Sequence, residues 1–180
     1  MGEMCSLENV ETLFKKEHEI ANHTFSHLRC NGAARSDLIR EYKASAAVLN
    51  RFGTDRSFAF PYGDFDAASL SFFSGRFDTI RTVKHGINSH KTDLNLLRAN
   101  PIYQSTELDI IHALIKKTKS SGGWLIFYTH DICPDPSKFG CTEERFKTIL
   151  SWVKEADLAV HTVGKSYRLL DALDRVDPVP

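Results

Sequence analysis

The sequence lacks the features that would place a chain in a membrane or on a nucleic acid. No apolar run approaches the roughly 20 residues that a membrane-spanning helix needs. Lysine and arginine together number 23, as do aspartate and glutamate, so the formal net charge is zero. Because a broad basic surface is needed to attract a phosphate backbone, this balance argues against nucleic acid as a partner. We expect neither a membrane segment nor a nucleic-acid complex.

Cysteine is scarce and widely spaced. The four cysteines, at positions 5, 30, 133 and 141, form no C-x-x-C pair, which argues against a zinc knuckle and against a disulfide framework. No repeat, low-complexity segment or long linker divides the 180 residues, and this length is sufficient for a substantial hydrophobic core. We therefore expect a single domain over residues 1–180, with a loose tail at 174–180.

Helix and strand signals alternate along the chain, which is typical of a parallel sheet covered by helices. We expect Ser36, Ser105 and Thr142 to begin helices, and Leu150 to face inward from the last of these. The expected helices cover residues 7–16, 36–52, 67–73, 105–119, 142–156 and 167–173, with Gly53 ending the second; the expected strands cover 18–21, 57–60, 77–83, 124–130 and 158–163. The 124–130 stretch, "WLIFYTH", is almost continuously apolar, as in a strand buried on both faces.

The stretch "HEIANHTFSHL", residues 18–28, concentrates three of the eight histidines. His23 and His27 are four residues apart, so on one helical turn both imidazoles could bind a single metal ion. Surface or capping histidines are the plain alternative for such a spacing. The pair follows a short strand, where α/β folds place their sites, and Thr24 and Ser26 could fix the ring orientations by hydrogen bonds.

Two further strand ends carry polar groups. The turn "PYGDFD", residues 61–66, follows the expected strand 57–60, and it is either a plain turn or part of a site. His130 ends the strand "WLIFYTH" and precedes Asp131. A histidine at that position is either structural or a proton donor whose pKa a neighbouring carboxylate can adjust.

Taken in order, "HEIANHTFSH", "FAFPYG" and "WLIFYTHD" resemble the second, third and fifth motifs of the polysaccharide deacetylase family, also called the NodB homology domain or carbohydrate esterase family 4. The resemblance implies a distorted (β/α) barrel. It also implies a divalent metal, commonly zinc, which activates a water to hydrolyse an acetamide or ester on a sugar chain. The expected partner is accordingly a carbohydrate substrate.

The resemblance also assigns roles by position. His23 and His27 would be metal ligands, and His130 would be the general acid that protonates the departing amine. The backbone amide of Tyr62 would help to stabilise the oxyanion, and Pro61, Tyr62 and Asp131 would contact the substrate. A general acid and an oxyanion donor are what the collapse of a tetrahedral intermediate requires.

The chain departs from the family pattern at its start. The first family motif, a strand ending in an Asp-Asp pair, supplies the catalytic base and a metal-binding carboxylate, and no Asp-Asp pair occurs in this sequence. The helix expected at residues 7–16 likewise has no strand before it. We expect an α/β fold of the NodB type whose barrel is incomplete and lacks its N-terminal strand or strands. Ala59 also stands where many relatives carry an arginine, and the region of Asp78 does not match the fourth motif.

Three interpretations remain open at the level of sequence. The chain is a fragment of a working hydrolase, a noncatalytic relative that binds carbohydrate or metal without turnover, or an interaction domain with a structural metal site. Glu19, Asp64 and Asp131 are candidate replacements for the missing carboxylate. Two neutral histidines without a carboxylate form an incomplete set of ligands, so the sequence predicts weak metal binding.

Overall fold

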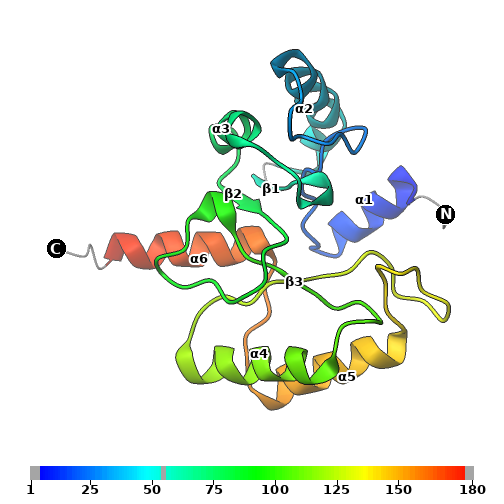
Figure 1. Ribbon diagram of the computed structural model, residues 1–180, viewed down its shortest axis with the longest axis vertical. Helices are drawn as coiled ribbons and strands as arrows, with labels where there is room; N and C mark the ends of the chain where they lie inside the picture. The colour runs from blue at the N-terminus through cyan, green and yellow to red at the C-terminus, as the bar shows by residue number, and fades with distance from the viewer. Residues whose placement is uncertain (1–4, 54–55, 177–180) are drawn as a thin grey trace. The chain divides into compact units, whose positions relative to one another are not determined.

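The computed structural model describes residues 5–53 and 56–176, and it combines helices with short parallel strands (Figure 1). The expected α/β class is therefore confirmed. Within the described ranges the strands form two separate two-stranded ladders, and no closed barrel is found. Backbone contacts divide the chain into two compact units, one with the residues up to Arg81 and from His161 onward, the other spanning Thr82–Val160. The expectation of one domain over residues 1–180 stays a prediction.

The first unit is built around two parallel strands. Its elements are α1 (Leu7–Lys15), α2 (Arg35–Leu49), η1 (Asn50–Phe52), β1 (Ser57–Ala59), η2 (Pro61–Gly63), α3 (Ala67–Ser74), β2 (Thr79–Arg81) and α6 (Val163–Val176). In the β1–β2 ladder, Phe58 lies opposite Ile80. Asn22 forms a parallel bridge with Phe58 on the other edge of β1, so three chain segments run side by side.

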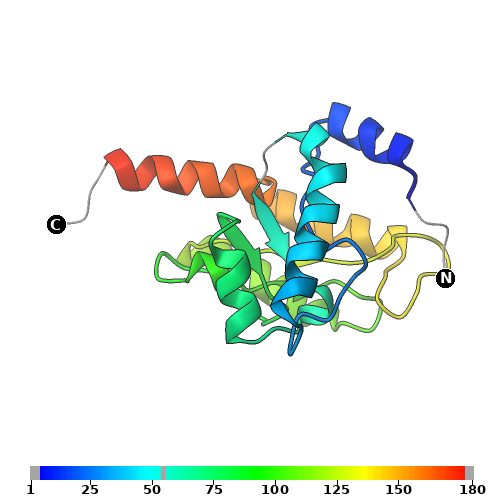
Figure 2. The same cartoon turned by 90° about the horizontal axis from the view of Figure 1, so that it is seen from above.

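Aromatic side chains pack against β1 and bury it. The buried cluster contains five phenylalanines, a cysteine and two aliphatic residues: Phe58, Phe60, Phe72, Phe73, Phe77, Cys30, Leu38 and Ile80. Phe58 of β1 stacks on Phe73 of α3 with ring centroids 4.2 Å apart. Such pairs contribute about 0.5–1.5 kcal/mol beyond the burial of their area. Figure 2 shows α2, which supplies Leu38, running beside β1. This core fixes the strand to which the histidine segment is attached.

The helix α2 begins one residue earlier than expected. Its first residue is Arg35 and its N-cap is Ala34, which makes no side-chain hydrogen bond, so the expected cap at Ser36 is wrong. The end agrees with expectation, because Gly53 follows η1 with a φ of +93°. A positive φ at this point favours glycine, which has no Cβ to clash.

Residues 18–21 do not form the expected strand. The chain leaves α1 through Glu17, whose φ is +64°, and reaches β1 only at Asn22. In the described structure the segment before His23 therefore pairs with β1 only through the bridge at Asn22 and forms no ladder with it.

The end of the chain also differs from expectation. The expected strand at 158–163 is wrong, because Leu158 donates its N–H to Val153 O and so closes the preceding helix. The final helix begins at Val163 instead of residue 167 and continues to Val176. Part of the expected loose tail is therefore helical, and residues 177–180 lie outside the described residues.

The second unit has an aliphatic core. Its elements are η3 (Leu94–Leu96), β3 (Asn100–Pro101), α4 (Leu108–Ser121), β4 (Phe127–Tyr128) and α5 (Glu143–Glu155). Buried isoleucines at positions 102, 111, 115 and 149 join α4 and α5 to the ladder. Only Phe127 and Tyr128 of the expected strand 124–130 enter a ladder, and only Ile126 of that stretch is buried. The expectation that both faces of this strand are buried is therefore wrong, because the side chains on either side of Ile126 all remain partly exposed.

Two helices of the second unit test the capping predictions. Thr142 caps α5 as expected, accepting the backbone N–H of Arg145. The expected cap at Ser105 is wrong, since α4 begins at Leu108. Leu150 is 45% exposed, against expectation, because it lies one helical step beyond the buried Ile149. In the part of the chain that is described, no helix has the length and apolarity to cross a membrane.

Candidate functional site

His23 and His27 lie together at the carboxyl end of β1. His23 Nδ1 is 2.6 Å from the carbonyl oxygen of Ala59, the last residue of β1. The centroids of the two imidazole rings are 4.8 Å apart. Because a carbonyl oxygen only accepts hydrogen bonds, Nδ1 of His23 carries the proton and the basic lone pair lies on Nε2. This is the tautomer with which a histidine binds a metal through Nε2.

The two rings meet on a loop, so the helical turn predicted from their spacing is wrong. Thr24 has a φ of +64° and His27 a φ of +60°, in the left-handed region that non-glycine residues seldom occupy. Local hydrogen bonds support this backbone. Asn22 Oδ1 accepts the N–H of Thr24 at 3.0 Å, and Thr24 Oγ1 accepts the N–H of Leu28 at 3.1 Å. The loop conformation therefore brings the imidazoles together.

A buried carboxylate of α2 anchors the middle of this histidine loop. Glu41 Oε2 accepts the backbone N–H groups of Phe25 at 2.9 Å and Ser26 at 2.7 Å, and Oε1 accepts the Ser26 hydroxyl at 2.8 Å. Glu41 is only 4% exposed. Burial acts to raise the pKa of this carboxyl, but the hydrogen bonds from Ser26 and Phe25 outweigh it, so the pKa lies below its ordinary value. The carboxylate therefore stays ionised.

Glu41 is the residue of this site that sequence reasoning missed. The helical spacing of Ile39, Tyr42, Ala46 and Leu49 predicts that these residues form the apolar face of this helix, whereas the structure buries Leu38, Glu41 and Ser45. Their spacing of three and four residues defines one helix face and was the available signal. Ser45 Oγ accepts a hydrogen bond from the side-chain amide of Asn22 at 2.8 Å. The same helix face therefore bonds to the histidine segment at two residues, Glu41 and Ser45.

The turn at Tyr62 lies against the histidines. Tyr62 has a φ of +59°, and its ring centroid is 4.4 Å from that of His27. Gly63 N–H bonds to Phe60 O, and Asp64 N–H bonds to Pro61 O, which closes the turn. Pro61 is buried, whereas Tyr62 is 56% exposed. The oxyanion and substrate-binding roles of these residues stay predictions.

Arg29 lies over the face of the Tyr62 ring and also forms an ion pair with Asp64. The Arg29 guanidinium carbon is 4.0 Å from the ring centroid, a cation–π geometry. Arg29 Nη1 is 3.2 Å from Asp64 Oδ2, and Asn31 Nδ2 donates to Asp64 Oδ1 at 3.0 Å. His27, Tyr62, Arg29 and Asp64 thus form a continuous row of contacts at the carboxyl end of β1.

His130 belongs to the second unit, where it follows β4. The residue is exposed. Its backbone N–H donates to Phe139 O at 3.1 Å, and its ring centroid is 5.2 Å from that of Phe139. A second aromatic ring, that of Tyr103, lies 6.1 Å from the imidazole centroid. The role of His130 as general acid stays a prediction.

Asp131 organises the loop that follows His130. Its carboxylate accepts the Ser137 N–H at 2.8 Å, the Ser137 hydroxyl at 2.6 Å and the Cys133 thiol at 3.5 Å. The hydrogen bonds from Ser137 hold the pKa of Asp131 below its ordinary value, and the charge of His130 contributes least. The substrate-binding role of Asp131 stays a prediction.

The carboxylates considered as replacements for the Asp-Asp pair all have other partners. Glu19 Oε2 accepts the Gly164 N–H at 2.8 Å near the start of α6, and Asp64 and Asp131 are bonded as described above. Among residues 5–53 and 56–176, no group of three or more histidine, cysteine or acidic side chains is placed to hold a metal ion. His23 and His27 fit a zinc ion in donor type and tautomer, and they would provide two of its ligands.

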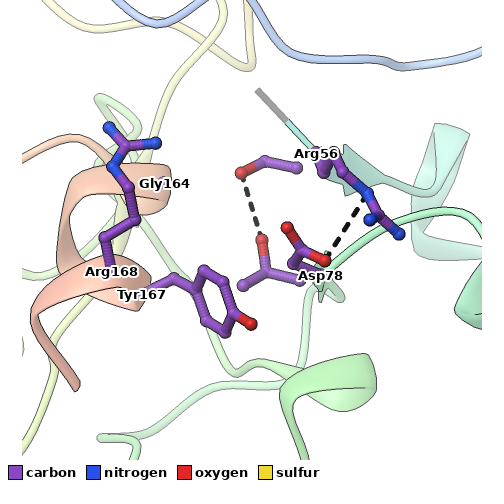
Figure 3. Close-up of a pocket in the computed structure, with 7 residues that line it drawn as sticks. Arg56, Asp78, Gly164, Tyr167 and Arg168 are labelled. Atoms are coloured by element: carbon purple, nitrogen blue, oxygen red, sulfur yellow. Dashed lines mark hydrogen bonds and ion pairs between the residues drawn. The ribbon is translucent and has the colours of Figure 1, made fainter. Parts of the chain in front are cut away.

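A polar cavity of about 210 Å³ lies at the opposite end of the first ladder (Figure 3). The residues that line it are Arg56, Ser57, Asp78, Thr79, Gly164, Tyr167 and Arg168. Arg56 pairs with Asp78 at 3.5 Å, and Thr79 Oγ1 donates to Ser57 Oγ at 3.1 Å. Ser57 is the first residue of β1, whereas His23 is bonded to the last one. The cavity is therefore separate from the histidine pair.

Comparison with known families identifies the first part of the chain. Residues 5–73 match the polysaccharide deacetylase family, and this segment contains His23, His27 and Tyr62 but not His130. No curated protein and no solved structure gives a significant match to the chain. The resemblance inferred from the sequence motifs is thus confirmed over residues 5–73.

Proposed function

Residues 5–73 contain polysaccharide deacetylase sequence, and from this premise we propose that the chain is a metal-dependent hydrolase that removes N- or O-acetyl groups from a polysaccharide or oligosaccharide. The observation that carries the proposal is the meeting of His23, His27 and Tyr62 at the carboxyl end of β1, inside the matched segment. The distorted, incomplete (β/α) barrel of the NodB type is the proposed fold.

In this proposal His23 and His27 bind the metal, for which zinc is the expected ion. The Nδ1–H of His23 donates to Ala59 O, which orients the ring and increases the basicity of Nε2. When bound, such an ion supplies a Lewis acid for the acyl carbonyl and makes water acidic enough to attack near neutral pH.

Tyr62 and His130 would then act on the acyl group. The backbone N–H of Tyr62, in a turn whose neighbouring amides of Gly63 and Asp64 bond within the turn, would donate to the oxygen that becomes negative during attack. His130 would donate a proton to the leaving nitrogen or oxygen, since an imidazole changes its charge near neutral pH. Pro61, Tyr62 and Asp131 are proposed to contact the carbohydrate.

A second candidate function is binding of carbohydrate or metal without turnover. The bonds of Asp64 to Arg29 and Asn31 favour it, because they engage both oxygens of a carboxylate that could otherwise serve as base or metal ligand. The same histidine pair and the same exposed tyrosine would serve this function.

The test measures acetate release from acetylated chitooligosaccharides and from acetylated xylan in the presence of zinc. We expect His23→Ala and His130→Ala to abolish release, while His18→Ala and His90→Ala, at exposed histidines of the first and second unit, leave it unchanged. Tyr62→Phe should retain most of the rate, because the proposed donor is the backbone N–H.

The outcomes separate the two functions. Zinc binding that requires His23, without any acetate release, would support the binding function over the hydrolase. Acetate release that survives both His23→Ala and His130→Ala would contradict the proposed roles of these residues.

A further inference from the structure

The spacing between the two proposed metal ligands depends on a loop that is held by hydrogen bonds from α2 as well as by its own. His23 and His27 are joined by three residues outside any helix or strand, and both Thr24 and His27 have a positive φ. Non-glycine residues keep such a backbone only where surrounding contacts impose it. The distance of 4.8 Å between the ring centroids therefore reflects whatever contacts fix this loop.

The strongest of these contacts come from one carboxylate. Glu41 accepts three hydrogen bonds from Phe25 and Ser26, two of the three residues between the histidines, at 2.7 to 2.9 Å. Bonds to an ionised acceptor are roughly twice as strong as bonds between neutral groups. Because Glu41 is buried, water does not compete freely for these donors.

The position of Glu41 makes this anchor rigid. It lies on α2 between Leu38, which is buried in the aromatic cluster, and Ser45, which accepts a hydrogen bond from Asn22. Asn22 precedes His23 and is bridged to β1. The histidine loop is thus attached to α2 at two positions one helical turn apart and to β1 at a third.

We propose that Glu41 is a positioning residue of the metal site: its carboxylate holds Phe25 and Ser26 so that the imidazoles of His23 and His27 converge before a metal binds. This inference rests on the proposed function, in which the two histidines are ligands. It assigns to Glu41 neither metal binding nor proton transfer. Loss of the carboxylate leaves both ligands present but lets their rings separate, so metal affinity falls.

The experiment compares zinc affinity, measured by competition with a chromophoric chelator, with amide hydrogen exchange at Phe25 and Ser26. We expect Glu41→Ala to weaken zinc binding by about tenfold or more, the effect typical of groups that orient metal ligands, and to speed exchange at both amides. Glu41→Gln should remain within about threefold of the wild type, because an amide of the same length can accept both N–H bonds and donate to the Ser26 hydroxyl.

Phe52→Ala provides the control for a general loss of stability. It truncates a buried ring of the first unit that packs on Phe14 of α1, outside the aromatic cluster that holds α2, so it should lower the thermal midpoint and leave zinc affinity unchanged well below that midpoint. If Glu41→Ala does not fold, Glu41→Asp replaces it, because a carboxylate one methylene shorter cannot reach both amides and the hydroxyl.

The results distinguish the inference from the function on which it rests. If His23→Ala abolishes zinc binding while Glu41→Ala binds zinc like the wild type, the positioning role is wrong and the metal site stands. Equal losses of zinc affinity in Glu41→Ala and Phe52→Ala, or in Glu41→Ala and Glu41→Gln, would also overturn the positioning role. If His23→Ala leaves zinc affinity unchanged, the proposed metal site is wrong and the role of Glu41 falls with it.

Discussion

The loop between His23 and His27 and the loop that follows His130 are organised in opposite ways. In the first unit, Glu41 reaches the loop between His23 and His27 from a separate helix, 15 and 16 residues along the chain from the groups it binds. In the second unit, Asp131 binds Ser137, six residues away, within the loop that follows His130. Each carboxylate accepts three hydrogen bonds, but Glu41 is almost fully buried and Asp131 is partly exposed.

This difference predicts how each loop responds to change. A loop held by a distant, buried carboxylate needs the tertiary packing that delivers that carboxylate, since hydrogen bonds among its own residues supply only part of what fixes its shape. A loop closed by a near carboxylate keeps its shape through local bonds that form early and cost little to close. We therefore expect the loop of His23 to depend on the core of the first unit, and the loop of Asp131 to depend on its immediate neighbours.

The largest expected effect on stability comes from the aromatic core that packs against β1. Phe58→Ala removes a ring that contacts Phe60, Phe73 and Phe77, and it should lower the free energy of unfolding by about 3–5 kcal/mol. Phe139→Ala, beside His130, removes a ring that is 42% exposed and should change it by less than about 0.5 kcal/mol. Urea unfolding followed by circular dichroism measures both, and comparable losses would contradict the difference between the two loops.

The second-largest expected effect on stability comes from removing the carboxylate of Glu41, for comparison with that of Asp131. Glu41→Ala leaves the N–H groups of Phe25 and Ser26, whose hydrogen bonds are part-buried, without their acceptor, which costs about 1 kcal/mol for each, so a loss of about 2 kcal/mol is expected. Asp131→Ala exposes its former partners to water, and we expect a smaller loss. The same urea titrations rank the two variants, and a larger loss in Asp131→Ala would reverse the comparison.

A smaller and more local effect is expected at Gly140. A Cβ at this position would collide with the side chain and the carbonyl oxygen of Asp131, so Gly140→Ala must displace the Asp131 loop. Amide exchange at Ser137 should become faster, while exchange at Ser26 stays unchanged. Gly75→Ala is the matched control, because nothing lies within 4 Å of its Cβ and its φ is −78°. Unaltered exchange at Ser137 would show that the loop does not depend on Asp131.

Features with local causes could be predicted from the sequence. The cap at Thr142 and the stop at Gly53 each follow from the residue itself and its nearest neighbours, and both were predicted. The pairing of His23 with His27 was predicted for a different reason, since a helical turn was expected and a loop was found. Closeness in sequence was sufficient to predict that the two imidazoles meet, but it did not predict the loop conformation that brings them together.

Features with distant causes could not be predicted in this way. Residues 158–163 have the composition of a strand, but Leu158 bonds to Val153 at the end of α5, α6 begins at Val163, and the residues between them lie in neither helix nor strand. Glu41 was missed because its partners, Phe25 and Ser26, are known only once α2 and the loop are packed together. A one-residue error in the buried face of α2 was enough to hide it.

The smallest expected effect concerns Asp66, which combines both kinds of anchor. Its carboxylate accepts the N–H of Ser69, three residues away, and that of Gly32, 34 residues away, and these bonds lower its pKa to about 2. The unfolded value is about 3.9, so the folded pKa is the lower one. The stabilisation is therefore fully present above about pH 5 and disappears as the pH falls toward 2.

Asp66→Asn tests this contribution, because asparagine keeps one acceptor oxygen but carries no charge. The wild type should be the more stable protein at pH 7, and the difference in thermal midpoint between the two should shrink steadily between pH 5 and pH 2.5. The effect should be modest, since Asp66 is accessible to solvent, which screens its charge. Amide hydrogen exchange at Gly32 and Ser69 then separates the distant hydrogen bond of Asp66 from its local one. If tertiary packing holds the distant bond, as it holds those of Glu41, Gly32 should lose protection only when the protein unfolds. Early and simultaneous loss of protection at both amides would show that Asp66 behaves as a local anchor like Asp131.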